Sequence, residues 1–170
     1  MKRKNLIRFA FYLLVIVIIG LFIIVVFKQE YSISDVRQLP VIEALTIHGD
    51  KFVSSDYLDS SKRTALLFFH PECEYCQKEL EGILAQHMAC NNVQWLFLTL
   101  ASEDVLGGFL RDYPLEAIPD AYVIRENWPD TYVQFGVKSP PELFIYNESR
   151  KLIKRHKGFT SIKTIVQELQ

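Results

Sequence analysis

The sequence predicts an α/β fold in which helices flank a mixed central sheet. Segments with the composition of buried strands alternate with helical segments through most of the chain. The apolar run 64–69 stops at a proline turn and continues as a helix, and the last two strands form a hairpin. Alternating strands and helices favour parallel pairing, to which a hairpin adds antiparallel strands. The 170 residues leave room for one compact domain.

The predicted elements of the folded domain begin at residue 39 with a hairpin. Its short strands, 41–46 and 51–53, flank a His-Gly-Asp turn. A helix cap or turn at 54–56 comes next, followed by the central strand and its helix, which continues to about residue 89. The remaining elements of this part are a buried strand at 93–100, a helix at 103–113, a strand at 121–124 and a short helix at 129–135.

The last part of the chain predicts a second hairpin and a closing helix. The strands 144–146 and 152–156 are joined by 147–150, whose composition is typical of a turn. Thr160 or Ser161 is then expected to cap a helix. Its apolar residues recur at helical spacing: Ile162, Ile165, Val166 and Leu169.

Two cysteines separated by two residues stand where the central strand gives way to its helix. Cys73 is expected at the helix start, where unpaired backbone N–H groups and the positive end of the macrodipole stabilise a thiolate. Cys76 follows one turn later on the same face, in a more enclosed position. This arrangement is typical of a dithiol redox pair in which one sulfur attacks and the other resolves. Two buried cysteines without chemistry remain the alternative.

Other binding functions are disfavoured by the composition. A structural zinc site needs four ligands, and the third cysteine, Cys90, has no ligand group around it. Cys90 also lies about 25 Å from Cys73 by helical rise, so we expect it to be a small buried apolar residue. We expect no metal and no cofactor, because the cysteines themselves carry the electrons. A net charge of −1 gives no reason to expect nucleic acid as a partner.

An apolar segment near the N-terminus predicts a membrane anchor. The run 9–27 nearly spans a hydrocarbon core of about 30 Å, and the residues before it are basic: Lys2, Arg3, Lys4 and Arg8. No small-x-small cleavage site follows the run, which favours an uncleaved anchor over a cleaved signal peptide. We expect residues 1–30 to form a cytoplasmic basic tip and a single transmembrane helix in the cell (inner) membrane. Residues 31–38 would be a tether, and 39–170 a periplasmic or other extracytoplasmic domain.

Two consecutive prolines directly precede the strand at 144–146. Pro140 and Pro141 remove two amide donors, so this segment is not interior sheet. One interpretation is a simple polyproline turn, and the other is that Pro141 is cis and packs beside the two sulfurs. In the second case the segment keeps metal ions away and offers a backbone edge to a thiol substrate. We therefore expect both prolines to bind substrate, together with Glu74 and Tyr75 between the cysteines.

The order of these elements resembles the thioredoxin superfamily, and more narrowly the membrane-anchored TlpA/ResA-like thiol-disulfide oxidoreductases. The resemblance covers residues 39–170 and implies a thioredoxin-like fold. The family commonly has a helical glutamate three residues after the second cysteine, matched by Glu79, and a Pro-Thr-Thr-Phe segment whose first and last residues fall on Pro141 and Phe144. The resemblance implies that Cys73 is the nucleophile, Cys76 the resolving thiol, Glu79 a proton relay and Pro141 a cis-proline. From the residues alone, Glu79 could instead be a surface glutamate paired with Lys78 or Lys62.

This chain departs from the family pattern around the first cysteine. Glu72 replaces the usual tryptophan, and the position of thioredoxin's buried aspartate falls on Leu67. The carboxylates of Glu72 and Glu74 disfavour a thiolate on Cys73, while the helix start favours it by about 0.3–1 kcal/mol, so the two effects are comparable. We therefore expect a reductant or an exchanger rather than a strong oxidant.

These observations predict a membrane-tethered protein-disulfide reductase. Its partners would be protein disulfides or dithiols, and the family resemblance suggests apocytochrome c or a membrane electron-donor thiol protein. A peroxiredoxin-like thiol peroxidase is one alternative, but that family needs threonine or serine where this chain has His70. His70, at a strand end before a proline, is expected to be structural, and the alternative is that it tunes the Cys73 thiol. A copper-handling or docking module is the other alternative, with His156 available, although copper carriers on this fold use CxxxC.

Overall fold

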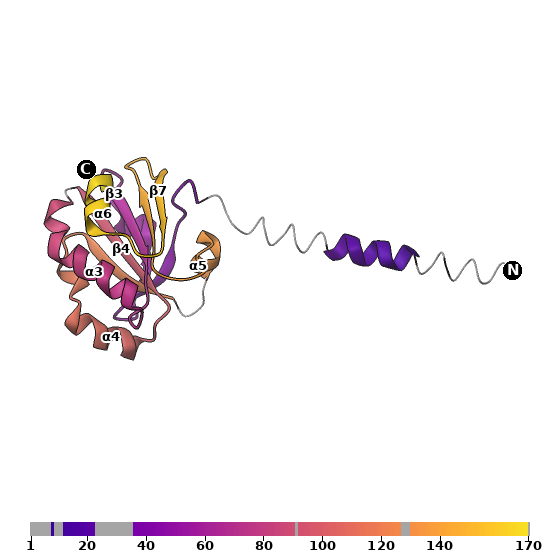
Figure 1. The fold of residues 1–170 in the computed structure, drawn as a ribbon, viewed down its shortest axis with the longest axis horizontal. Helices are drawn as coiled ribbons and strands as arrows, with labels where there is room; N and C mark the ends of the chain where they lie inside the picture. Colours follow the sequence, from indigo (N-terminus) through magenta and orange to yellow (C-terminus); the bar gives the residue numbers. More distant parts are fainter. Residues whose placement is uncertain (1–7, 9–11, 23–35, 91, 127–129, 170) are drawn as a thin grey trace. The chain divides into compact units, whose positions relative to one another are not determined.

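The computed structural model describes residues 8, 12–22, 36–90, 92–126 and 130–169, in two compact units. The first unit is Met1–Ser34 and the second is Asp35–Gln170. In the first unit, residues 12–22 are helical (Figure 1). Among the described residues, no helix has both the length and the apolar character needed to cross a membrane. Most of the predicted anchor, including its basic residues 2–4, lies outside the described residues.

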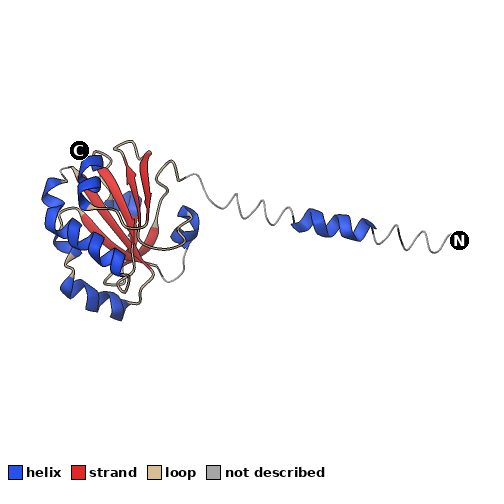
Figure 2. Ribbon diagram, viewed as in Figure 1, coloured by secondary structure: helices blue, strands red, loops and turns tan. Residues whose placement is uncertain are grey.

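A mixed sheet of seven strands forms the centre of the second unit, in the order β2-β1-β5-β4-β3-β6-β7 (Figure 2). The three middle strands are parallel: β3 (Arg63–Phe68), β4 (Val93–Thr99) and β5 (Ala121–Arg125). Two antiparallel hairpins flank them: β1 (Glu43–Thr46) with β2 (Lys51–Val53), and β6 (Glu142–Tyr146) with β7 (Leu152–Lys157). The expected mixed sheet and both expected hairpins are confirmed.

Helices cover both faces of this sheet, as Figure 1 shows. The cluster on one face packs under α3 (Glu74–Gln86), α4 (Glu103–Asp112) and α6 (Ile162–Leu169). The cluster on the other face includes residues of α5 (Asp130–Phe135) and packs close to the short α2 (Ser54–Tyr57). Side chains of β3 alternate between the two clusters, with Leu67 in the first and Leu66 and Phe68 in the second. A strand buried on both faces explains the continuous apolar run in its sequence.

Most helices end close to the residues that the sequence predicts. The helix after the cysteines continues as a 3₁₀ turn over His87–Ala89, and the chain then reverses at Asn92, whose φ is 59°. Ser161, and not Thr160, caps α6, because its Oγ accepts the backbone N–H of Thr164 at 3.3 Å. A second 3₁₀ turn, Leu115–Ala117, was not expected. Residue 129 of the predicted short helix lies outside the described residues.

The folded unit includes the last three residues of the predicted tether. Val36 accepts a hydrogen bond from the Tyr146 hydroxyl at 3.0 Å, and the carbonyl of Arg37 accepts the Leu152 N–H at 2.7 Å. Gln38 forms an antiparallel bridge with Lys151. These residues extend the pairing of the last hairpin, so they belong to the second unit although they precede the start of the domain expected at residue 39. The other tether residues, 31–35, lie outside the described part of the chain.

Candidate active site

Cys73 occupies the N-cap position of α3, at the carboxyl end of the central strand. The Phe69 N–H still bonds the Leu98 carbonyl of β4, and the chain then turns, with the Cys73 N–H donating to the His70 carbonyl at 3.1 Å. The turn places the Cys73 sulfur over the first helical turn, where it accepts the Cys76 N–H at 3.3 Å. An N-cap side chain normally satisfies one of the unpaired N–H groups of a helix, and here a sulfur does so.

The two cysteines form no disulfide in this structure and differ in exposure. Cys73 is partly exposed, whereas Cys76 is fully buried in the core under α3. Burial raises the pKa of the Cys76 thiol, and its hydrogen bond with the Cys73 side chain raises it further. The accessible sulfur is therefore placed to react first, and its buried neighbour remains a thiol until it is used.

The proline segment lies directly against the first cysteine. The Pro140–Pro141 peptide bond is cis, as the second interpretation of this segment predicts, and the simple polyproline turn is wrong. The Pro140 carbonyl lies 3.8 Å from the Cys73 sulfur, within reach of a thiol hydrogen. The Pro141 carbonyl accepts the Gly158 N–H at 2.9 Å, which ties the segment to the loop after β7. Neither proline has an N–H, so this edge presents only carbonyl acceptors to a substrate.

Glu79 lies inside the protein, one turn beyond Cys76. Its side chain belongs to a residue that is only 1% exposed, and its Oε2 accepts the Thr160 N–H at 2.9 Å. No hydrogen-bond donor among the described residues reaches its Oε1. Burial raises the pKa of Glu79 to about 7, and the Thr160 N–H opposes this shift. This carboxyl group can therefore gain or lose a proton near neutral pH.

The interpretation of Glu79 as a surface residue paired with a lysine is wrong. Lys62 instead pairs with Asp120 at 2.7 Å, and Lys78 lies over the Tyr75 ring, 5.8 Å from its centroid. The spacing of three residues from Cys76 placed Glu79 on the inner side of α3, and the covering segment that buries it comes from the far end of the chain.

The sequence matches no protein-family model and no curated protein sequence. Solved structures match the second unit. StoA from Bacillus subtilis is 17% identical over 77% of this chain and 97% of that chain, with a TM-score of 0.61. The exposed lipoprotein thioredoxin Etrx1 of Streptococcus pneumoniae is 20% identical over 76% and 98%, with a TM-score of 0.62. A secreted Mycobacterium tuberculosis disulfide oxidoreductase homologous to E. coli DsbE is 16% identical over 80% and 98%, with a TM-score of 0.63.

The domain has the thioredoxin-like fold. The structures that it resembles are those of thioredoxin-like thiol-disulfide oxidoreductases, as the family resemblance of the sequence predicts. At these identities the likeness is one of fold, and the chemistry depends on the residues of this chain. In the thioredoxin-like domain, Cys73, Cys76, Glu79 and the proline pair come together from α3 and the start of β6.

The remaining predicted site residues form the outer rim of this site. Glu74 is exposed, and Tyr75 is 62% exposed between the two cysteines. Glu72, on the other side of Cys73, is also exposed. The His70 ring accepts the Glu72 N–H at 3.3 Å, which is the structural role expected for this histidine. Glu72 and Glu74 thus flank Cys73 in the chain, and both side chains are exposed.

Two other residues that the sequence singled out lie apart from the sulfurs. Cys90 is 7% exposed at the far end of α3, where it lines a hollow of about 200 Å³. His156 on β7 bonds Glu168 of α6 at 2.5 Å. Within the described part of the chain, no group of three or more His, Cys, Asp or Glu side chains is arranged to hold a metal ion.

Sequence reasoning missed three residues around the site of the thioredoxin-like domain. Tyr132 of α5 donates to the carbonyls of Phe69 and Leu98, at 3.2 and 3.3 Å, where the two strands end beside the cysteine turn. Arg155 of β7 pairs with the buried Glu142, which directly follows the cis-proline. Glu142 lies opposite Lys157 in the hairpin, and Arg155 lies opposite Phe144, so the pair forms on a diagonal that the sequence does not reveal. Tyr132 likewise had no signal in the sequence.

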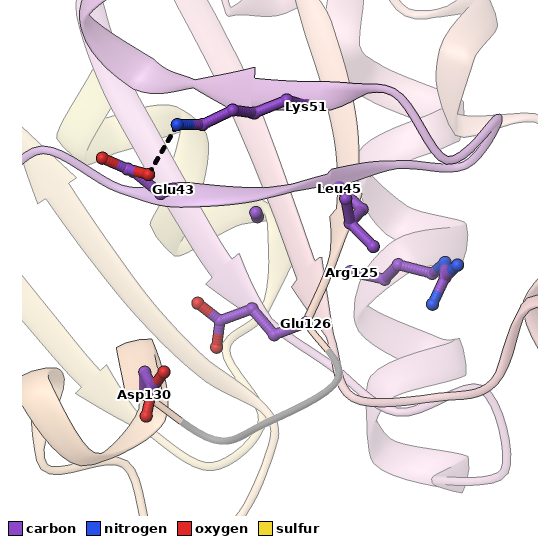
Figure 3. Close-up of a pocket in the computed structure, with 7 residues that line it drawn as sticks. Glu43, Leu45, Lys51, Arg125, Glu126 and Asp130 are labelled. Carbon is purple, nitrogen blue, oxygen red and sulfur yellow. Dashed lines mark ion pairs between the residues drawn. The ribbon is translucent and has the colours of Figure 1, made fainter.

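A larger pocket lies elsewhere on the domain, between the β1–β2 hairpin and the end of β5 (Figure 3). Its volume is about 390 Å³, and Lys51 and Glu43 form an ion pair of 2.9 Å at its edge. The Glu126 carboxylate accepts the Thr131 N–H at 3.1 Å and the Thr131 hydroxyl, so it serves to hold the start of α5. None of the predicted site residues lines this pocket.

Proposed function

We propose that this protein is a thiol-disulfide oxidoreductase that reduces or exchanges disulfides in other proteins. The observation that carries the proposal is the pairing of a partly exposed Cys73 at a helix start with a buried Cys76 one turn later. The Pro140 carbonyl beside the first sulfur supports it, as does the likeness to thiol-disulfide oxidoreductase structures.

The reaction begins when the Cys73 thiolate attacks one sulfur of a substrate disulfide. A bond forms between Cys73 and that sulfur, the substrate S–S bond breaks, and the released substrate thiolate takes a proton from solvent. Cys76 then loses its proton and attacks the Cys73 sulfur, which forms the Cys73–Cys76 disulfide and releases the second substrate thiol. Two electrons pass from the protein to the substrate, and a dithiol donor must return them.

Glu79 is the group that we assign to receive the Cys76 proton. Its pKa of about 7 leaves an ionised fraction at neutral pH that can accept a proton. The raised pKa of Cys76 keeps that sulfur protonated until it attacks, which prevents it from competing with Cys73 for substrate. The spacing of one helical turn between the two side chains favours this transfer directly or through one water.

The location of the domain is part of the proposal. The basic residues before the apolar run 9–27, and the missing cleavage site after it, favour a single-pass anchor with a cytoplasmic N-terminus. The domain would then act on protein disulfides outside the cell membrane, with a membrane thiol protein as electron donor. Apocytochrome c, whose haem-binding cysteines must be reduced, is a substrate of the right chemical class.

Trapping of the mixed disulfide tests this function. Full-length protein carrying Cys76→Ala, expressed in its native membrane, should accumulate partners that are disulfide-linked to Cys73 and released by dithiothreitol. The matched variant Cys73→Ser should trap none. Purified wild-type domain should also reduce insulin disulfides. If Cys76→Ala traps no partner and the wild-type protein reduces no insulin, the proposal is refuted. Maleimide labelling of Cys73 in intact cells separately checks the location of the domain.

A further inference from the structure

Arg155 of β7 makes three contacts that converge on the proline segment. Its Nε donates to Glu142 Oε1 at 2.5 Å, and its Nη2 donates to the Gly136 carbonyl at 3.1 Å. Its guanidinium lies over the Phe144 ring, 4.7 Å from the centroid. Arginine suits this task because its planar group can donate in several fixed directions and stack on an aromatic ring at the same time.

These contacts fix both ends of one loop. Gly136 ends the turn after α5, with a φ of 62° that favours glycine, and Glu142 is the first residue of β6. Between them lie residues 137–141, which include the two prolines. Arg155 therefore bonds the residue before this loop and the residue after it, while the ring of Phe144 anchors the guanidinium to the sheet.

The middle of the loop is held much less directly. Val137 donates to the Tyr132 carbonyl at 2.8 Å, and Pro141 accepts from Gly158. Lys138 and Ser139 are exposed, and Pro140 is partly exposed with its carbonyl 3.8 Å from the Cys73 sulfur. The distance between that carbonyl and the sulfur thus depends on where the two ends of the loop are fixed.

The ion pair at the loop's end is partly shielded from water. The Glu142 side chain is 4% exposed and that of Arg155 is 25% exposed. A carboxylate this buried needs a partner, and without Arg155 it would pull toward solvent and carry Pro141 with it. Arg155 is thus suited both to neutralise Glu142 and to hold Gly136 in place.

We propose that Arg155 is a positioning residue that sets the proline segment against Cys73 for binding of protein disulfides. The inference rests on the proposed reductase function. It predicts a selective loss, because a protein substrate must dock along the Pro140 edge, whereas a small disulfide needs only the sulfur. Misplacement of a docking group by about 1 Å can cost up to a hundredfold in rate.

The test compares insulin with 5,5′-dithiobis(2-nitrobenzoate) as substrates of the full-length protein. Arg155→Met should lower kcat/KM for insulin about tenfold, mainly through KM, and change the rate with the small disulfide less than twofold. Arg155→Lys should be intermediate, because it retains the charge near Glu142 and not the fork that reaches Gly136. The control is Arg63→Met, which breaks a more exposed arginine–glutamate pair, with Glu148 at 3.3 Å, at the end of β3 away from the cysteines.

A double variant keeps the test informative if Arg155→Met folds poorly. Arg155→Met with Glu142→Gln removes the unpaired buried charge, so it should recover the melting temperature and still show the raised KM for insulin. If its KM equals that of wild type, Arg155 only neutralises Glu142 and the positioning role is wrong. If rates with both substrates fall equally, the inference is likewise wrong. Wild-type protein that reduces neither substrate would instead refute the proposed function.

Discussion

The backbone N–H of Thr160 donates a hydrogen bond of 2.9 Å to Glu79 Oε2, joining residues 81 positions apart in the chain. Two residues earlier in the same loop, the Gly158 N–H bonds the carbonyl of Pro141. One loop therefore connects the buried carboxyl group of α3 with the proline segment. The partly exposed Phe159 lies between these two bonds. A change in the charge of Glu79 therefore changes the strength of a hydrogen bond that holds this loop.

Glu79 should make the stability of the domain depend on pH. Folding raises the pKa of its carboxyl group from 4.5 to about 7, so the native state binds this proton more tightly than the unfolded state. The contribution is complete below about pH 4.5 and is lost as pH rises through 7. Glu79→Gln should reduce the difference in unfolding free energy between pH 5 and pH 8 by about 2 kcal/mol. Urea titrations at the two pH values measure this.

The exposed Glu81 on the same helix provides the matched control for that experiment. Glu81→Gln replaces an exposed carboxyl group and leaves the buried Glu79 in place, so it should leave the pH dependence of unfolding nearly unchanged. An unaltered pH dependence in Glu79→Gln would show that its carboxyl group is not perturbed.

Resolution of the mixed disulfide should also depend on Glu79. Without a proton acceptor beside Cys76, attack on the Cys73 sulfur should slow by about tenfold to a hundredfold in Glu79→Gln near pH 7. The mixed disulfide should accumulate in a rapid-quench experiment. The rate of its resolution should have an inflection near pH 7 in the wild type and none in Glu79→Gln. Equal resolution rates for the two proteins across pH 6 to 8 would contradict the relay.

Gly82 and Gly107 should respond oppositely to replacement by alanine. A Cβ on Gly82 would lie 3.0 Å from the Cβ of Ile162, where α3 packs against α6, whereas a Cβ on Gly107 of α4 meets no atom within 4 Å. Alanine is favoured over glycine in helices by about 1 kcal/mol. Gly107→Ala should therefore stabilise the domain by roughly 0.5–1 kcal/mol, and Gly82→Ala should destabilise it by about 1–3 kcal/mol.

Denaturant unfolding of the two glycine variants measures both effects. A double-mutant cycle of Gly82→Ala with Ile162→Gly, which removes that Cβ, should show a favourable coupling energy if contact with Ile162 causes the loss. A stabilised Gly82→Ala would mean that the two helices separate without cost.

Glu72 and Glu74 should give the proposed thiol-disulfide exchange a preference for basic substrates. Both carboxylates are exposed next to the attacking sulfur, so a positive charge near a substrate disulfide should speed its encounter. The assay compares two disulfide peptides that differ only in having lysines or glutamates beside the disulfide. The ratio of kcat/KM for the lysine peptide to kcat/KM for the glutamate peptide should fall about three- to tenfold at low salt in the Glu72→Gln, Glu74→Gln double variant. The control is Glu116→Gln, an exposed substitution at a distant position in the chain, which should leave this ratio unchanged.

Salt provides an independent check on that preference. The wild-type ratio should fall toward that of the double variant as ionic strength rises, because exposed charges are screened over about 8 Å at 0.15 M salt. If the ratio of kcat/KM values changes neither with salt nor with the substitutions, these residues do not select substrates by charge.

The elements that the sequence predicted best are those whose signal is local. β3 and β4 are buried on both faces, so their apolar runs were visible without knowledge of their neighbours. The place of Cys73 at the start of a helix was predicted because a strand, a turn and a helix follow one another in the local sequence. The cis bond before Pro141 was one of two interpretations, and only the packing of the segment against Cys73 distinguished them.

What sequence reasoning missed depends on contacts between distant segments. The spacing of Glu79 from Cys76 gave its side of the helix, but its burial depends on the loop that carries Thr160. Residues 36–38 looked like tether because their composition is polar, and they are ordered by pairing with the last hairpin. Arg155 and Glu142 meet across two strands whose register no single strand determines.

The place where the chain joins the sheet has a consequence for access to the sulfurs. The Val36 carbonyl accepts a hydrogen bond from Tyr146, the last residue of β6, whereas Pro141 directly precedes the first residue of that strand. Five residues separate Pro141 from Tyr146, so the two are roughly 17 Å apart along the chain at about 3.4 Å per residue. The incoming polypeptide and the reactive end thus occupy opposite ends of one strand. A bulky client could therefore approach the sulfurs without competing for space with residues 36–38.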